Sequence, residues 1–192
     1  MRHKPINKKL FAQNRQRLAE LIAPKSLAVL NANDVLPTNA DGSLPMQPNA
    51  DLFYLSGIEQ EESVLLLFPD AAEEKHREIL FVREPTDHLK IWEGYKHSKA
   101  DARKISGVKN VQWLSEFPVM FRLLMCDAES AYFNTNEYKR ASVKVETRDD
   151  RFIRKSKRDF PLHSYRRLAP LLHRLRMSKS DIELELIKIG RA

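Results

Sequence analysis

The stretch QPNADLFYLSGI, residues 47–58, carries the strongest local signal in this chain. Asn49 and Asp51 have short polar side chains that suit capping and turn positions, and Gly57 suits a backbone with a positive φ angle. We interpret the apolar residues between them, including Tyr54 and Leu55, as a buried strand. The stretch is therefore expected to be structural, with polar residues that shape its ends.

Two more apolar runs follow it. The acidic residues 59–62 separate the stretch from SVLLLFPD at 63–70, and REILFVRE follows at 77–84. Three strands in close succession predict an antiparallel meander. We interpret the acidic cluster Glu59, Glu61 and Glu62 as a solvated turn between strands rather than as a cation site.

Upstream, a helix and a strand precede a long loop. Apolar residues recur at helical spacing over residues 7–22 and Pro24 ends the pattern, which predicts an amphipathic helix. SLAVLNA, residues 26–32, is typical of a buried strand. Residues 33–50 are rich in Asn, Asp and Pro, and a loop of this length is often a binding loop.

Downstream, short strands around VQW (111–113) and AYF (131–133) alternate with helical stretches at 115–126 and 142–157. This alternation predicts an α/β fold, with one mixed β-sheet flanked by helices on both faces. PLHSYRRLAPLLHRLRM, residues 161–177, is interpreted as a helical stretch interrupted by Pro170. Ser180 and Glu183 form a capping box that starts a new helix close to residue 192.

Composition excludes several protein classes. The 192 residues, 42% of them hydrophobic, suit one ordinary domain, and no run reaches the roughly 18 apolar residues of a membrane span. The first residues lack the apolar centre of a secretion signal, so we expect a cytoplasmic protein. Cys126, the single cysteine, is expected to lie on the buried side of a helix.

The positive charge is concentrated at one end. The formal net charge is +7, but residues 1–138 carry net −2 and residues 139–192 carry net +9. Arg151, Arg154, Lys155 and Arg158 fall on one face of a helix, while Phe152 and Ile153 turn away from it. Such a stripe can face an acidic neighbouring domain or subunit, or the phosphates of a nucleic acid.

Motifs for catalysis are absent from the sequence. The six histidines show no HExxH motif and no i,i+4 pairing, so we expect no metal site and no catalytic residue in this chain. The sequence also has no GxSxG elbow and no glycine-rich phosphate loop.

Three separated stretches resemble one family. QPNADLFYLSGI is similar to the FRQNSDFYYLTGF-like motif of the creatinase/prolidase N-terminal domain. Ile91, Trp92 and Gly94 match that family's IW-x-G motif, and residues 171–192 resemble its linker into the catalytic domain. Gln47 and Pro48 depart from the usual arginine and glutamine, as Gln60-Glu61 does from the usual Glu-Pro. The matches favour the aminopeptidase P branch, that is, the N-terminal domain of a Xaa-Pro aminopeptidase.

The resemblance implies a ribonuclease-H-like topology for residues 1–176, with residues 177–192 as linker and first helix of a following pita-bread metallopeptidase domain. That domain would bind two manganese ions through two Asp, one His and two Glu beyond residue 192. The full-length protein would release an N-terminal residue that precedes proline. The 192-residue chain alone is expected to be inactive.

For this chain the resemblance implies a role in substrate access and in oligomer assembly. Its partners would be its own catalytic domain, further copies in a dimer or tetramer, and a peptide with proline in second position. Trp92 is a candidate for the substrate cleft, or alternatively a core or domain-interface aromatic. The stripe Arg151, Arg154, Lys155 and Arg158 is a candidate interface. Alternatives are a prolidase-type dipeptidase, a catalytically dead scaffold, and a basic nucleic-acid-binding module, which the shortage of aromatic residues near the stripe disfavours.

Overall fold

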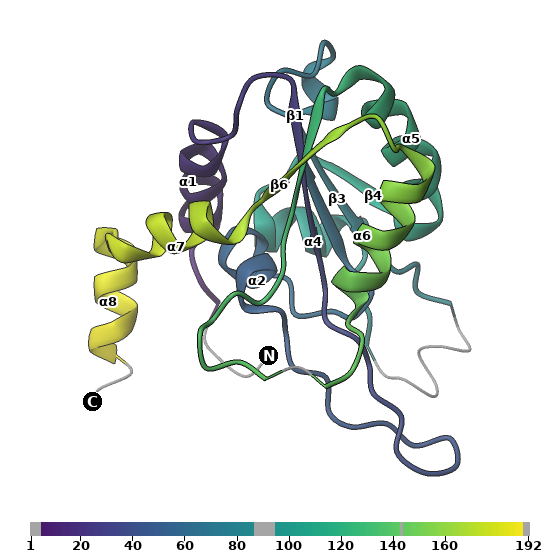
Figure 1. Ribbon diagram of the computed structural model, residues 1–192. Coiled ribbons are helices and arrows are strands. Elements are labelled where there is room, and N and C mark those ends of the chain that lie inside the picture. The colour runs from purple at the N-terminus through teal and green to yellow at the C-terminus, as the bar shows by residue number, and fades with distance from the viewer. Residues whose placement is uncertain (1–4, 87–94, 143, 190–192) are drawn as a thin grey trace.

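The computed structural model describes residues 5–86, 95–142 and 144–189. A central sheet of six strands lies between two layers of helices in the described chain (Figure 1). The strands are β1 (Ser26–Asn31), β2 (Val64–Leu67), β3 (Glu78–Val82), β4 (Asn110–Trp113), β5 (Ser130–Phe133) and β6 (Ser164–Arg167). The helices are α1 (Lys8–Ala19), α2 (Ala50–Ser56), α4 (Lys99–Ser106), α5 (Phe117–Asp127), α6 (Arg148–Asp159), α7 (Ala169–Met177) and α8 (Asp181–Ile189).

The strand order is β4-β3-β2-β1-β5-β6. β2 pairs antiparallel with β1 and β3, whereas the pairs β1 with β5, β5 with β6, and β3 with β4 are parallel. The sheet is therefore mixed, and its antiparallel meander consists of β1, β2 and β3, so only the second and third strands of the predicted meander belong to it. The helix predicted for residues 7–22 and the strand predicted for residues 26–32 are also confirmed, as α1 and β1.

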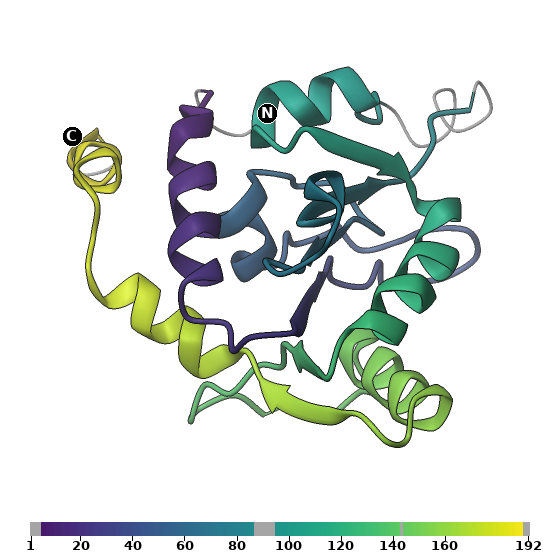
Figure 2. The same cartoon turned by 90° about the horizontal axis from the view of Figure 1, so that it is seen from above.

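Two hydrophobic cores cover the two faces of the sheet. Alternate residues of β1 point into each core, Ala28 and Leu30 on one side and Leu27 and Val29 on the other. The helices α1, α2, α4 and α7 pack over the first face, and α5 and α6 over the second (Figure 2). The predicted α/β class, with helices on both faces, is confirmed.

The segment that was predicted to be the first strand of the meander is a helix. Residues 50–56 form α2, which Asn49 caps by accepting hydrogen bonds from the backbone N–H groups of Asp51 and Leu52, both at 3.0 Å. Gly57 ends the helix with φ of 69°, as its positive-φ assignment predicted. Periodicity cannot distinguish so short an apolar run from a strand, and the cap decides it.

Two other local predictions were wrong. Ser164–Arg167 form the edge strand β6 instead of helix, and Pro170 stands in the first turn of α7, so it starts that helix rather than interrupting one. Cys126 is exposed, because Phe121, Leu124 and Met125 supply the buried side of α5.

Candidate functional site

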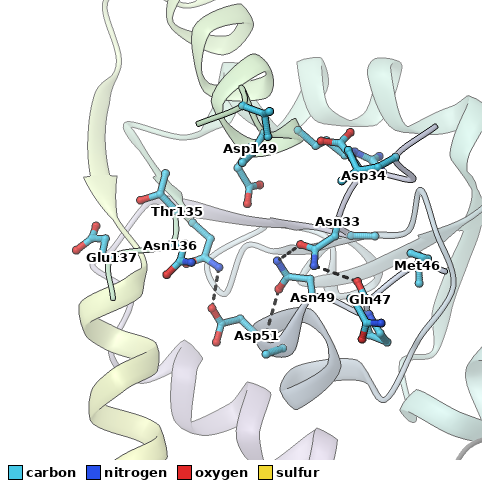
Figure 3. Close-up of a pocket in the computed structure, with 18 of the residues that line it drawn as sticks. Asn33, Asp34, Met46, Gln47, Asn49, Asp51, Thr135, Asn136, Glu137 and Asp149 are labelled. Atoms are coloured by element: carbon cyan, nitrogen blue, oxygen red, sulfur yellow. Dashed lines mark hydrogen bonds between the residues drawn. The ribbon is translucent and has the colours of Figure 1, made fainter. Parts of the chain in front are cut away.

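A cavity of about 650 Å³ lies at the carboxyl ends of the neighbouring strands β1 and β5. These strands are neighbours and parallel, so the residues that follow them meet at the same edge. The segment 32–34 after β1 and the segment 134–137 after β5 line the cavity, together with the loop at 44–51 and the start of α6 (Figure 3). We call this cavity the strand-end pocket.

The 47–58 stretch supplies part of its lining, and a chain of amide hydrogen bonds fixes that part. Asn49 Nδ2 donates to Asn33 Oδ1 at 3.0 Å, and Asn33 Nδ2 donates to the Gln47 carbonyl oxygen at 3.0 Å (Figure 3). Since Asn49 Oδ1 caps α2 at the same time, one side chain ties the loop after β1 to the start of that helix.

Asp51 connects three elements at the pocket. Its carboxylate accepts a hydrogen bond from Asn134 Nδ2 at 2.9 Å and pairs with Arg176 Nη1 at 2.6 Å. The Arg176 guanidinium also lies over the Tyr54 ring, 5.2 Å from its centroid. Asp51 thus links α2 to the end of β5 and to α7.

Asp149 enters the pocket from the first turn of α6, which Thr147 caps. Asn31 Nδ2 donates to Asp149 Oδ1 at 2.8 Å. Burial raises the pKa of the Asp149 carboxyl to about 6, because the charged form is poorly solvated there. Figure 3 shows this carboxyl group pointing into the pocket, on the side that faces Asp51.

The described residues provide no set of metal ligands. Across residues 5–86, 95–142 and 144–189, no three His, Cys, Asp or Glu side chains gather closely enough to hold a metal ion. The acidic cluster after α2 differs from the predicted solvated turn, because the largely buried Glu61 pairs with Lys96 and Arg83. No described helix has the length and apolar character needed to cross a membrane.

The basic stripe predicted from the sequence does not line the strand-end pocket. Trp92 falls outside the described residues. The basic stripe does lie on α6, and Phe152 and Ile153 turn toward the core as predicted. Each stripe residue has an acidic partner within the chain: Arg151 pairs with Asp34, Arg154 with Glu146, and both Lys155 and Arg158 with Asp159. The repulsion between these positive charges is therefore already reduced by carboxylates of the same chain, and it does not require anions from another molecule.

Sequence reasoning missed the pocket residues Asn134 and Asp149, and it missed Asn31, which donates to Asp149. A usable signal existed, because Asn31 and Asn134 each stand at the end of a buried apolar run. Polar residues at the ends of neighbouring parallel strands indicate a ligand site in α/β folds. The missing information was that β1 and β5 are neighbours.

The chain matches the family model described as "Aminopeptidase P, N-terminal domain" over residues 11–132. The chain belongs to this family. The matched range includes β1 to β4, the first three residues of β5 and the 47–58 stretch, so the aminopeptidase P N-terminal domain accounts for most of the sheet and for much of the strand-end pocket.

Two relatives and a metal-containing structure illustrate the likeness. Xaa-Pro aminopeptidase of Escherichia coli is 26% identical over 184 residues, which cover 95% of this chain and 42% of that protein. A structure of a putative aminopeptidase P from Bacillus anthracis matches with a TM-score of 0.84 and 27% identity, over 95% of this chain and 43% of that one. A zinc-substituted E. coli aminopeptidase P in complex with product matches at TM-score 0.73 and 25% identity, over 95% of this chain and 41% of that one. This chain therefore spans less than half the length of these relatives.

Proposed function

We propose that this chain is the amino-terminal part of a Xaa-Pro aminopeptidase that removes the N-terminal residue preceding proline. The family match over residues 11–132 carries this proposal, together with relatives more than twice as long as the chain. Two metal ions, manganese by preference, would activate the attacking water in a catalytic domain outside this chain. The present domain would limit substrate access to peptide ends in a cytoplasmic enzyme.

The apolar face of α8 supports a domain boundary near residue 177. Figures 1 and 2 show α8 standing away from the sheet, beyond α7. Its apolar side chains are exposed: Leu184, Leu186, Ile187 and Ile189. Exposed apolar side chains on a short amphipathic helix suit burial against another domain. We therefore assign residues 1–176 to this domain, and residues 177–192 to a linker and the first helix of the catalytic domain.

Two groups of residues extend the proposal to specific contacts. Trp92 would contact substrate at the active-site mouth, and the α6 stripe (Arg151, Arg154, Lys155 and Arg158) would face another subunit of a dimer or tetramer. The exposure of Arg154 and Arg158, with side chains 74% accessible, supports the second assignment. An exposed guanidinium remains able to form new contacts even when it has a partner within the chain.

The activity is tested on the full-length protein. We expect it to release the first residue from a Xaa-Pro-Yaa tripeptide and to leave the matching Xaa-Ala-Yaa peptide intact. Activity should vanish with a chelator and return with Mn²⁺, while the 192-residue chain releases nothing. Cleavage of Xaa-Pro dipeptides alone would indicate the dipeptidase instead. Absence of proline-dependent release with every divalent ion tried would refute the proposed activity.

A further inference from the structure

The strand-end pocket is acidic although the chain as a whole carries +7. Its lining contains four carboxylates against two guanidinium groups: Asp34, Asp51, Glu137 and Asp149, and Arg148 and Arg176. Where a partly enclosed carboxylate lacks a cationic partner, it makes the local potential more negative and favours a cation over an anion.

Three of the four carboxylates already have cationic partners. Asp34 pairs with Arg151 and Asp51 with Arg176, and Glu137 accepts from Arg167 Nε at 2.9 Å. Within the described residues, Asp149 forms no ion pair, and it accepts a hydrogen bond from the neutral Asn31 amide. The adjacent Arg148 donates instead to the Glu62 carbonyl oxygen at 3.1 Å, and its charge is a smaller influence on Asp149 than burial.

A second acceptor in the same lining lacks a donor. Asn134 is 5% exposed, and its Nδ2 is used by Asp51, while its buried Oδ1 has no hydrogen-bond partner among the described residues. Val29 and Phe133 are paired residues on the neighbouring strands β1 and β5, and Asn134, directly after Phe133, lines the pocket together with Asp149. A buried acceptor without a donor costs free energy, which a ligand with N–H donors would recover.

Part of the lining is apolar. Five residues from the loops that follow β1 and β5 contribute to it: Leu36, Leu44, Pro45, Met46 and Val145. Leu36 and Leu44 are 47% and 50% exposed, so apolar surface is available to a ligand beside the polar end of the pocket. The volume of about 650 Å³ falls within the range of pockets that hold small molecules.

We propose that the strand-end pocket binds a monovalent organic cation, an ammonium or guanidinium group attached to an apolar body, with the Asp149 carboxylate and the Asn134 side-chain carbonyl as its anchors. One carboxylate and one amide oxygen are too few protein ligands for a calcium ion, which takes six to eight oxygen donors. An N–H cation needs fewer acceptors and forms strong charge-assisted hydrogen bonds to a carboxylate. The proposal concerns binding by this chain itself and is independent of the peptidase activity.

The test titrates 3-methylbutylammonium chloride into the 192-residue chain at constant ionic strength. Binding is monitored by the chemical shifts of the backbone amides in NMR spectra. We expect saturable shifts at Asn134 and Asp149, and none with 3-methylbutanol, which has the same apolar body without charge or N–H donors. Asp149→Asn should weaken binding about tenfold or more, as expected for loss of one charge-assisted hydrogen bond. Glu129→Gln, which removes an exposed carboxylate outside the pocket that pairs with Lys25, should leave the affinity within about twofold.

A pH series on the unmutated chain gives a second readout that does not depend on a variant. The charged groups that act on Asp149 are Arg148, Asp150 and Asp51, and His173 also lines the pocket. The pKa of Asp149 is about 6, so affinity should be lower at pH 5 than at pH 7 by about tenfold. Butylguanidinium in place of the amine distinguishes an arginine-like occupant from a terminal or lysine-like ammonium. Three outcomes would each overturn the proposal: the alcohol binds as tightly as the amine, Asp149→Asn binds the amine as tightly as the unmutated chain, or the shifts do not saturate by about 50 mM amine.

Discussion

Asp51 and Arg176 are 125 residues apart in sequence and form an ion pair of 2.6 Å between Oδ1 and Nη1. The pair joins the first turn of α2 to the end of α7, just before the segment that leads to α8. It therefore fixes the end of α7, and with it the start of the segment that leads to α8, relative to α2. Asp51 belongs to the 47–58 stretch, so the stretch with the strongest sequence signal also positions the start of that segment.

Asp51→Asn should lower the free energy of unfolding by about 1 kcal/mol. The two side chains are partly exposed, 24% for Asp51 and 40% for Arg176, which limits the electrostatic gain from the pair. Urea unfolding of Asp51→Asn, Arg176→Gln and the double variant measures the coupling between them. Fully additive effects of the two single changes would contradict the assigned link. Lys25→Met, which removes the exposed pair with Glu129, is the control and should cost less.

Gly57→Ala should destabilise the fold much more than Gly107→Ala, although both glycines have positive φ. A Cβ at Gly57 would lie 2.4 Å from Cε2 of the buried Phe11 ring, whereas at Gly107 the nearest atoms are 3.7 Å away. We expect about 1 kcal/mol of backbone strain at Gly107, and about 2–4 kcal/mol at Gly57 once the displaced ring is included. Urea unfolding of both variants checks this, and equal losses would show that the contact with Phe11 is unimportant.

The strands that are long and apolar could be predicted from sequence, because burial on both faces leaves a continuous apolar run, as in Ser26–Asn31. Two elements could not. α2 has only seven residues, too few for periodicity to decide, and β6 is a polar edge strand whose sequence has little apolar pattern. Both depend on tertiary neighbours that a local pattern does not contain.

The candidate site was predictable in part. The 33–50 loop was expected to bind, and residues 44–50 of it line the strand-end pocket. Asp149 could not be identified, because an aspartate in the first turn of a helix is usually a solvated capping residue. Its burial and its bond to Asn31 follow from the way β1 packs near α6, across 118 residues of sequence.

Arg15→Met should be among the most destabilising single changes in α1. The Arg15 side chain is 1% exposed and donates to the carbonyl oxygens of Leu55 and Ser106, at 2.7 and 3.0 Å, and to Glu78 at 3.0 Å. It thus holds the ends of α2 and α4 beside β3. Leaving these acceptors unpaired should cost about 3–5 kcal/mol.

The matched control for Arg15 is Arg103→Met, which removes an exposed arginine that donates to the Lys109 carbonyl oxygen at 3.0 Å. It should cost less than about 1 kcal/mol, since water can replace the lost bond. Urea midpoints for the two variants compare them directly. Similar losses would mean that Arg15 acts through its aliphatic stem rather than through its hydrogen bonds.

Replacing Arg154, Lys155 and Arg158 with glutamine in the full-length protein tests the proposed subunit interface. We expect a smaller oligomer at moderate salt, because the exposed guanidinium groups would lose their partners on the neighbouring subunit. Sedimentation across a salt series measures this, alongside retention on DNA and RNA. The control is a second triple variant with the same change in charge, in which glutamine replaces Lys139, Arg140 and Lys144. Loss of a salt-sensitive nucleic-acid affinity without a change in oligomer size would favour the nucleic-acid-binding module instead.

Asp149→Asn should make the chain more stable at neutral pH. The folded-state pKa of about 6 lies above the ordinary value of 3.8, so the folded protein binds this proton more tightly than the unfolded chain does. The contribution of Asp149 to stability is therefore complete below pH 4 and is lost as pH rises through 6. The asparagine side chain of the variant does not ionise, so the variant does not lose stability in this way. We expect its free energy of unfolding at pH 7 to exceed that of the unmutated chain by about 1–3 kcal/mol, and this difference should disappear near pH 4.

Asp150→Asn, in the same helical turn, should change the stability at neutral pH in the opposite direction. Hydrogen bonds from the Thr147 backbone N–H and hydroxyl hold the pKa of Asp150 below its usual value, so its charged form stabilises the fold. Asp150→Asn should therefore be less stable than the unmutated chain at pH 7, with the difference shrinking as pH falls through the pKa of Asp150. Urea unfolding of both variants between pH 4 and pH 7 separates the two residues. The quantity to compare is the difference in the free energy of unfolding between Asp149→Asn and the unmutated chain. If this difference is no larger at pH 7 than at pH 4, then Asp149 is better solvated or better paired than its contacts with Asn31 and the pocket indicate.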